Sequence, residues 1–169
     1  TIFLENNILP IFVFDGKSSD LKDLIKQERC KKKNLAIEKL KNADAEEAIK
    51  LEKMAFTIKS EDIKNLQIML DLIGIPWIIA NQEADSLCAW LSLRPTKNPY
   101  VKGVISDDGD MLPLGCPYLF KDMSKFLKSS SEIQVISLKK ILKHLKMTHQ
   151  EFIDFCVLLG TDYCERIKG

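Results

Sequence analysis

Apolar residues along this chain gather in short runs that are separated by long polar stretches. Residues 8–14, 75–80 and 101–106 are runs rich in β-branched and aromatic side chains, a composition that predicts β-strands. Two shorter runs, residues 118–120 and 133–137, predict a fourth and a fifth strand. The chain therefore contains several short strands interrupted by segments of a different pattern.

The segments between these strands have helical patterns. Residues 17–73 contain neither glycine nor proline and are rich in Lys, Glu, Leu and Ala, which predicts long helices with a break near residues 42–44. Residues 83–93, 138–145 and 149–159 predict three further helices, and residues 95–99 predict a loop. Because strands alternate with helices, we expect an α/β fold with a mostly parallel sheet.

Composition narrows the class of protein. The chain has 169 residues, which suits a single domain over residues 1–169, and no apolar run is long enough to cross a bilayer, so we expect no membrane partner. Its five cysteines are scattered without a C-x-x-C pair, which favours reduced thiols in an intracellular protein. The 25 basic and 24 acidic residues nearly cancel, so only their distribution can indicate a nucleic-acid partner.

Acidic residues stand at or near the ends of the apolar runs. In α/β sheets ligands bind beyond the carboxyl ends of strands, and carboxylates gathered there need positive charge among them. A pair of divalent cations supplies it, and the natural substrate of such a site is a phosphodiester. The acidic segments are Phe14-Asp15-Gly16, Glu83-Ala84-Asp85, Asp107-Asp108-Gly109-Asp110 and Gly160-Thr161-Asp162-Tyr163.

Each of these acids also has an ordinary explanation. Asp15 and Asp108 stand beside glycines, as in solvated turns, and Asp162 suits the N-cap of a following helix. Glu83 and Asp85 suit the positive end of a helix dipole, and they converge only if Glu83 lies at the loop–helix junction.

A basic stripe follows the first acidic residue. Lys22, Lys26, Arg29 and Lys33 are spaced by four, three and four residues, so they share one helix face that could lie over a phosphate. The alternative is a solvated helix face, since Asp23 and Glu28 lie nearby. Six aromatic residues are assigned to the core: Phe12, Phe14, Trp77, Trp90, Phe152 and Phe155.

Several motifs occur together and in a familiar order. They are Val13-Phe14-Asp15-Gly16-Lys17, Gly74-Ile75-Pro76, Glu83-Ala84-Asp85 with Cys88-Ala89, Asp108-Gly109-Asp110, and the long segment from Phe155 through Leu158-Leu159-Gly160-Thr161-Asp162-Tyr163-Cys164. With these motifs the chain resembles the flap endonucleases, the structure-specific 5′-nuclease family that includes the xeroderma pigmentosum group G nucleases. The likeness runs from about residue 8 to residue 169.

The resemblance implies a PIN-like three-layer α/β fold with a helical arch at about residues 22–60 and the start of a helix-two-turn-helix at residues 160–169. It implies hydrolysis of phosphodiesters in branched DNA with 5′ flaps, in replication or repair, with two Mg²⁺ ions for which Mn²⁺ can substitute. The implied metal ligands are Asp15, Glu83, Asp85, Asp108, Asp110 and Asp162. Lys22 and Arg29 would contact the scissile phosphate, and Lys26 and Lys33 would bind DNA. The resemblance also implies a sliding-clamp partner, bound through a region absent here, and a place in the nucleus or at a viral or cellular replication site.

Three departures from the family keep alternatives open. One further metal-site Asp of the family has no match before residue 8, Asp85 stands where the family usually carries Glu, and the chain stops as the helix-two-turn-helix begins. We therefore expect a fold that is incomplete at both ends. The alternative function is a catalytically impaired module that binds branched DNA, and a third is an RNA-directed nuclease of the wider PIN group.

Overall fold

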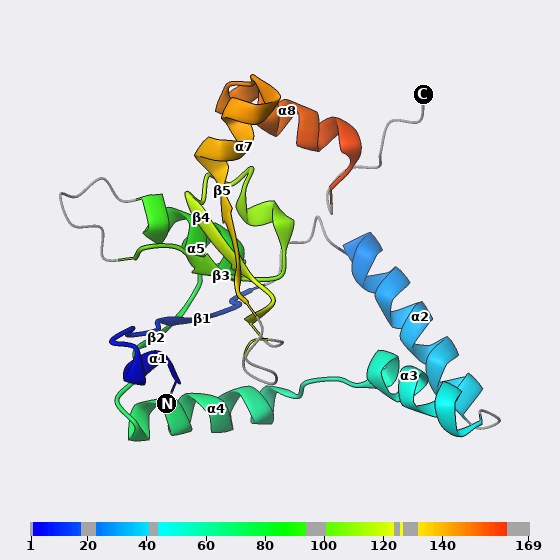
Figure 1. The fold of residues 1–169 in the computed structure, drawn as a ribbon. Coiled ribbons are helices and arrows are strands. Elements are labelled where there is room, and N and C mark those ends of the chain that lie inside the picture. The colour runs from blue at the N-terminus through cyan, green and yellow to red at the C-terminus, as the bar shows by residue number, and fades with distance from the viewer. Residues whose placement is uncertain are drawn as a thin grey trace. The chain divides into compact units, whose positions relative to one another are not determined.

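The computed structural model describes residues 2–17, 23–40, 44–93, 101–123, 126 and 132–161. These form two compact units, one made of Thr1–Phe12 and Ser18–Ile78 and the other of Val13–Lys17 and Ile79–Gly169. Figure 1 labels their helices and strands. No helix in the described ranges is both long and apolar enough to cross a membrane.

The first unit is helical. It contains α1 (Ile2–Glu5), α2 (Asp23–Leu40), α3 (Ala45–Ala55) and α4 (Ser60–Leu72). Helices α2 and α3 pack side by side, as Figure 1 shows, and Ala36 of α2 and Leu51 of α3 are buried. Helix α3 begins where Asp44 Oδ1 accepts a hydrogen bond from the Glu47 backbone N–H at 2.8 Å.

The helical segment contains a break that the sequence pattern did not predict. The break that was expected near residues 42–44 falls partly outside the described ranges, which omit residues 41–43, and Asp44 caps the helix that follows. A second break separates α3 from α4 although no glycine or proline stands there. Asp62 Oδ2 accepts a hydrogen bond from the Lys59 N–H at 2.8 Å, so a carboxylate marks the start of α4.

Strands β1 (Phe12–Phe14) and β2 (Trp77–Ile79) pair in a two-stranded sheet. Phe12 N donates to Pro76 O at 3.0 Å and Ala80 N donates to Phe14 O at 2.9 Å, so the bonds advance along both strands in one direction and the pair is parallel. The prediction of a strand over residues 8–14 was wrong for residues 8–11. Pro10 has no N–H to give to a ladder, which explains the late start of β1.

The second unit contains a three-stranded sheet in the order β3–β4–β5, formed by Val104–Ile105, Tyr118–Lys121 and Gln134–Ser137. Strands β3 and β4 are parallel, as predicted, whereas β4 and β5 are antiparallel. A Cβ at Gly103 would lie 2.5 Å from Phe120 Cε2 and 2.6 Å from Tyr118 O, so only glycine fits this approach to β4. The described strands thus form two small sheets.

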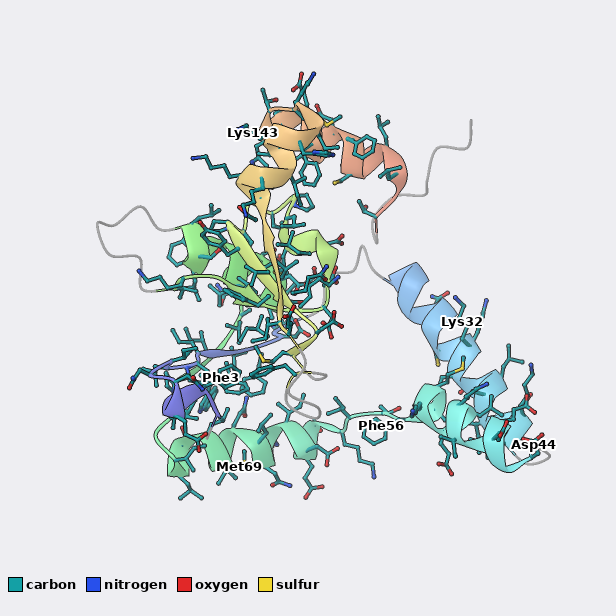
Figure 2. All side chains as sticks on the ribbon, viewed as in Figure 1. Phe3, Lys32, Asp44, Phe56, Met69 and Lys143 are labelled. Carbon is teal, nitrogen blue, oxygen red and sulfur yellow. The ribbon has the colours of Figure 1, made fainter. Side chains whose placement is uncertain are left out.

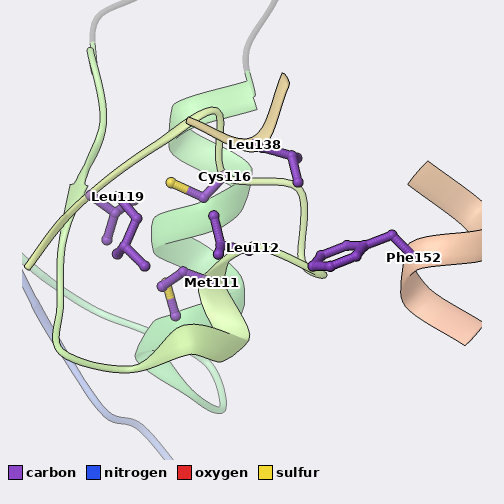
Figure 3. Close-up of a cluster of buried hydrophobic side chains, with 7 residues drawn as sticks. Met111, Leu112, Cys116, Leu119, Leu138 and Phe152 are labelled. Carbon is purple, nitrogen blue, oxygen red and sulfur yellow. The ribbon is translucent and has the colours of Figure 1, made fainter. Parts of the chain in front are cut away.

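Helix α5 (Ala84–Leu93), the 3-10 turn η2 (Gly109–Met111), α7 (Leu138–Leu145) and α8 (His149–Leu159) complete the second unit. Helix α5 packs against η2 and β3. Figure 3 shows the buried cluster between these elements, in which Met111, Cys116 and Leu119 have no exposed surface. Its members are Val104, Met111, Leu112, Cys116, Leu119, Leu138 and Phe152.

The assignment of aromatic residues to the core was correct for only part of the set. Phe152 is 8% exposed and belongs to the buried cluster. Trp90 is 53% exposed, Phe155 40% and Phe12 36%, so their assignment to the core was wrong. A hydrophobicity pattern cannot tell a covered apolar face from an exposed one.

Candidate active site

The end of β1 is fixed against the start of α5. Asp15 Oδ1 accepts a hydrogen bond from the Ala84 backbone N–H at 2.9 Å, across 69 residues of sequence. Gly16 N donates to Gln82 O at 2.7 Å. A Cβ on Gly16 would collide with the carbonyl oxygen of Ala80, so this close approach requires glycine. The two hydrogen bonds place Asp15 directly beside the acidic start of α5.

The start of α5 lies between Glu83 and Asp85, which is the arrangement that lets both side chains point to one side. The helix begins at Ala84, so Glu83 lies at the loop–helix junction and Asp85 in the first turn. This confirms the condition under which Glu83 and Asp85 can point to one side. Asp15 also gives the first N–H of the helix an acceptor, which positions the segment that carries both acids.

The acidic turn after β3 is held by bonds between side chains and backbone. Asp107 Oδ1 accepts from Asp122 N at 3.0 Å, and Asp108 Oδ1 accepts from Asp110 N at 2.9 Å. Ser106 Oγ accepts from Asp108 N at 3.0 Å. Asp107 is thus a structural residue of the turn, and Asp108 caps η2, on which Asp110 lies. Since η2 packs against α5, the turn and this helix belong to one packed region.

Two cysteine thiols have a pKa that nearby carboxylates help to raise. Burial raises the pKa of Cys88 to about 11, with further contributions from Asp85, Cys116 and Asp15. Burial, followed by the charge of Asp110, raises the pKa of Cys156 on α8. Asp15, which follows β1, and Asp85 of α5 therefore act on the same thiol, and Asp110 of η2 acts on a thiol of α8. Both thiols lie in motifs that the sequence already singled out, but nothing in their spacing marked them as neighbours of these acids.

The basic stripe is only partly within the described structure. Lys26, Arg29 and Lys33 belong to α2, and their spacing of three and four residues keeps them on one helix face. Lys33 is half-buried. Lys22 and the sixth acid, Asp162, lie outside the described residues.

The donor set suits a hard divalent cation, because all of the candidate ligands are carboxylates. Within the described ranges, no three His, Cys, Asp or Glu side chains form a group that could hold a metal ion. The structure places Asp15 at the start of α5 and packs η2 against α5. The described residues alone do not bring three ligands together.

The sequence matches one protein-family model and is similar to flap endonucleases of known sequence. The family model described as the XPG I-region matches residues 74–162, slightly more than half of the chain. Flap endonuclease 1 of Enterocytozoon bieneusi is 33% identical over 171 residues, which cover 99% of this chain and 47% of that protein. This chain thus spans about half the length of the relatives that it matches.

Solved structures with the same arrangement of elements include the catalytic core of Rad2 in complex with a DNA substrate. That structure has a TM-score of 0.68 and 29% identity, and the match covers 99% of this chain and 45% of that chain. Flap endonuclease-1 from Methanococcus jannaschii has a TM-score of 0.67 and 28% identity, over 99% of this chain and 53% of that chain.

Proposed function

This chain belongs to the XPG I-region family and has the PIN-like 5′-nuclease fold of its solved relatives. We therefore propose that it forms part of a structure-specific endonuclease. Its substrate is branched DNA with 5′ flaps, and its setting is replication or repair. The observation that carries the proposal is the hydrogen bond from Ala84 N to Asp15 Oδ1, which gathers acids from two distant segments at the end of a strand.

The proposed ligands of two Mg²⁺ ions, or of Mn²⁺ in their place, are Asp15, Glu83, Asp85, Asp108, Asp110 and Asp162. When bound, such ions polarise the phosphate, lower the pKa of an attacking water and stabilise the leaving oxygen. The chain's own part is to hold the carboxylates in place, which the Asp15 bond and the capped turn at Asp108 support. Lys22 and Arg29 would neutralise charge that develops on the phosphate.

The DNA-binding part of the proposal rests on the first unit. Lys26 and Lys33 would bind the backbone of the flap from an arch at about residues 22–60, which includes the packed pair α2 and α3. Residues 160–169 would begin the helix-two-turn-helix. A sliding clamp is the proposed protein partner, through a region other than this one, and the proposed location is the nucleus or another site of DNA replication.

The test is cleavage of an end-labelled 5′-flap DNA by the purified protein in Mg²⁺ and in EDTA. We expect Mg²⁺-dependent cutting near the branch that Asp110→Asn abolishes. Asp154→Asn is the matched control, because Asp154 is a carboxylate of the same unit that bonds Gln150 rather than the site. Full activity of Asp110→Asn would show that the ligands are assigned wrongly.

A catalytically impaired module that binds branched DNA is the second candidate. It stays open because Asp85 stands where the family usually carries Glu, which gives a shorter reach to an ion. Binding of the flap DNA in EDTA, together with no cutting in Mg²⁺ or Mn²⁺, would support this module over the nuclease.

A further inference from the structure

Helix α7 exposes a dense basic surface. Lys139, Lys140, Lys143 and His144 are all exposed on this eight-residue helix, and Lys146, its C-cap, is exposed too. We call these five residues the α7 basic face. Figure 2 labels Lys143 within it.

The apolar side of α7 fixes which way the lysines face. Leu138 is buried, and Ile141 and Leu142 pack against the same hydrophobic cluster. Lys146 ends the helix in the left-handed region, with φ 56°, and donates its N–H to Leu142 O. Because the inner face is occupied by the core, the basic residues cannot turn inward.

The charge of this face is not balanced locally. No acidic residue occurs between residues 133 and 150. The next carboxylates on the C-terminal side have other partners: Glu151 Oε2 accepts from Thr148 N at 2.7 Å, and Asp154 Oδ1 accepts from Gln150 Nε2 at 3.0 Å. The described part of the chain shows no ion pair to the lysines of α7.

The helix dipole of α7 accounts for the basic residues at one end of the helix only. Lys143 and His144 lie in the last turn, where positive charge is favourable. Lys139 and Lys140 lie in the first turn, where the same dipole disfavours positive charge, and no acidic residue stands there. An anionic partner outside the chain would stabilise all of them.

We propose that the α7 basic face binds the phosphate backbone of a duplex arm of the DNA, a contact that rests on the proposed function. An eight-residue helix is about 12 Å long. A duplex carries a negative charge about every 1.7 Å along its axis, so a face of this length meets several phosphates. Lysines on flexible stems bind phosphates as point charges without reading bases, which suits a contact that adds affinity rather than sequence specificity.

The test measures the salt dependence of DNA affinity in EDTA, where no cutting occurs. A fluorescent blunt duplex, a 5′-flap DNA and a single strand of equal length are titrated with the protein and with the double variant Lys140→Gln/Lys143→Gln. The control Lys64→Gln/Lys102→Gln removes the same charge from two exposed lysines outside α7. Glutamine keeps a good helix propensity, and circular dichroism checks that each variant is folded.

For the duplex and the flap DNA we expect the α7 variant to lower the slope of log K against log salt by about 1.8, which is about 0.9 per lost phosphate contact. At low salt its affinity should fall about tenfold or more, and the control should match the wild type. Lys140→Arg/Lys143→Arg should restore both values. This rescue would separate lost charge from disturbed folding.

Four results would overturn the inference. They are an unchanged slope in the α7 variant, an equal loss in the control, a wild-type protein that does not bind duplex DNA, and a loss of affinity confined to the single strand. Flap cleavage in Mg²⁺ is scored separately, so a protein that cuts flaps with an unchanged slope would keep the proposed function and lose only this contact.

Discussion

At the scale of single residues, Asp15 has two roles that substitutions can separate. Its carboxylate accepts the Ala84 N–H and also supplies charge. Asp15→Asn keeps an oxygen acceptor and loses the charge, whereas Asp15→Ala loses both. We expect amide exchange of Ala84, measured by NMR without metal, to rise about fivefold in Asp15→Ala, as for the loss of about 1 kcal/mol, and to stay near wild type in Asp15→Asn.

Flap cleavage should respond differently to the same two variants. Both Asp15→Asn and Asp15→Ala should lose it, because both lack the charged ligand. Equal exchange rates of Ala84 in the wild type and in Asp15→Ala would show that the hydrogen bond does not hold the start of α5.

Cys88 gives a second residue-scale prediction, through its ionisation. The raised pKa, about 11 in place of 9.0, keeps Cys88 a neutral thiol at pH 8 to 9. Only the thiolate is alkylated, so the reaction of Cys88 with iodoacetamide should keep accelerating up to about pH 11. Exposed Cys30 is the internal reference and should react faster, as followed by peptide mass spectrometry.

Asp85, one of the carboxylates that raise the pKa of Cys88, provides the control. Asp85→Asn removes a negative charge that disfavours the thiolate, so the pKa of Cys88 should fall and its alkylation at pH 9 should quicken. If Cys88 reacted as fast as Cys30 throughout the pH range, the packing of this thiol between the core and the acids would be wrong.

At the scale of elements, α8 depends on its first turn. Thr148 Oγ1 accepts from Glu151 N at 3.3 Å, and the Glu151 side chain bonds back to Thr148, which forms a capping box. Thr148→Ala should lower the free energy of unfolding by about 1 kcal/mol, whereas Thr148→Ser should be close to wild type. Urea denaturation followed by circular dichroism measures both.

The capping box also has a pH dependence. The hydrogen bonds from Thr148 lower the pKa of Glu151 below its usual value. A lowered pKa means that the bond stabilises the fold above the ordinary glutamate pKa, and that this contribution is lost as the pH falls through the lowered value. The wild-type advantage over Thr148→Ala should therefore shrink in acid, and an advantage that grew there would contradict the cap.

The elements that could be predicted from sequence are those with strong local signals. Helices α7 and α8 have the predicted bounds, because their apolar spacing is regular and Thr148 with Glu151 marks the start of α8. The break between α3 and α4 was missed because its signal is one side-chain bond, from Asp62 to Lys59 N, rather than a glycine or proline.

At the scale of the whole molecule, the sequence named the acids but could not show which of them meet. The contact between Asp15 and Ala84 spans 69 residues and depends on Gly16 approaching the Ala80 carbonyl, which no local pattern reveals. The wrong assignment of Trp90 and Phe155 to the core has the same cause, since burial depends on partners that lie elsewhere in the chain. Local chemistry was therefore more predictable than tertiary contact.

The last prediction concerns metal and stability, and its measurement does not depend on cleavage. A ligand that binds only the folded state stabilises it by RT ln(1 + [L]/Kd), about 2.7 kcal/mol at a hundredfold excess over Kd. Mg²⁺ should therefore raise the melting temperature of the protein in a concentration-dependent way. Asp108→Asn/Asp110→Asn should abolish that rise, while Asp154→Asn should keep it.

In EDTA, where no Mg²⁺ can bind, the double variant should not melt at a lower temperature than the wild type. Neighbouring carboxylates repel one another when no cation lies among them, so neutralising Asp108 and Asp110 should leave the metal-free protein as stable as the wild type or more so. Asparagine at position 108 also keeps an oxygen to accept the Asp110 N–H, so the turn should survive. If Mg²⁺ shifted the melting temperatures of the double variant and the wild type equally, the bound ion would lie elsewhere, and the two-metal assignment to these acids would be wrong.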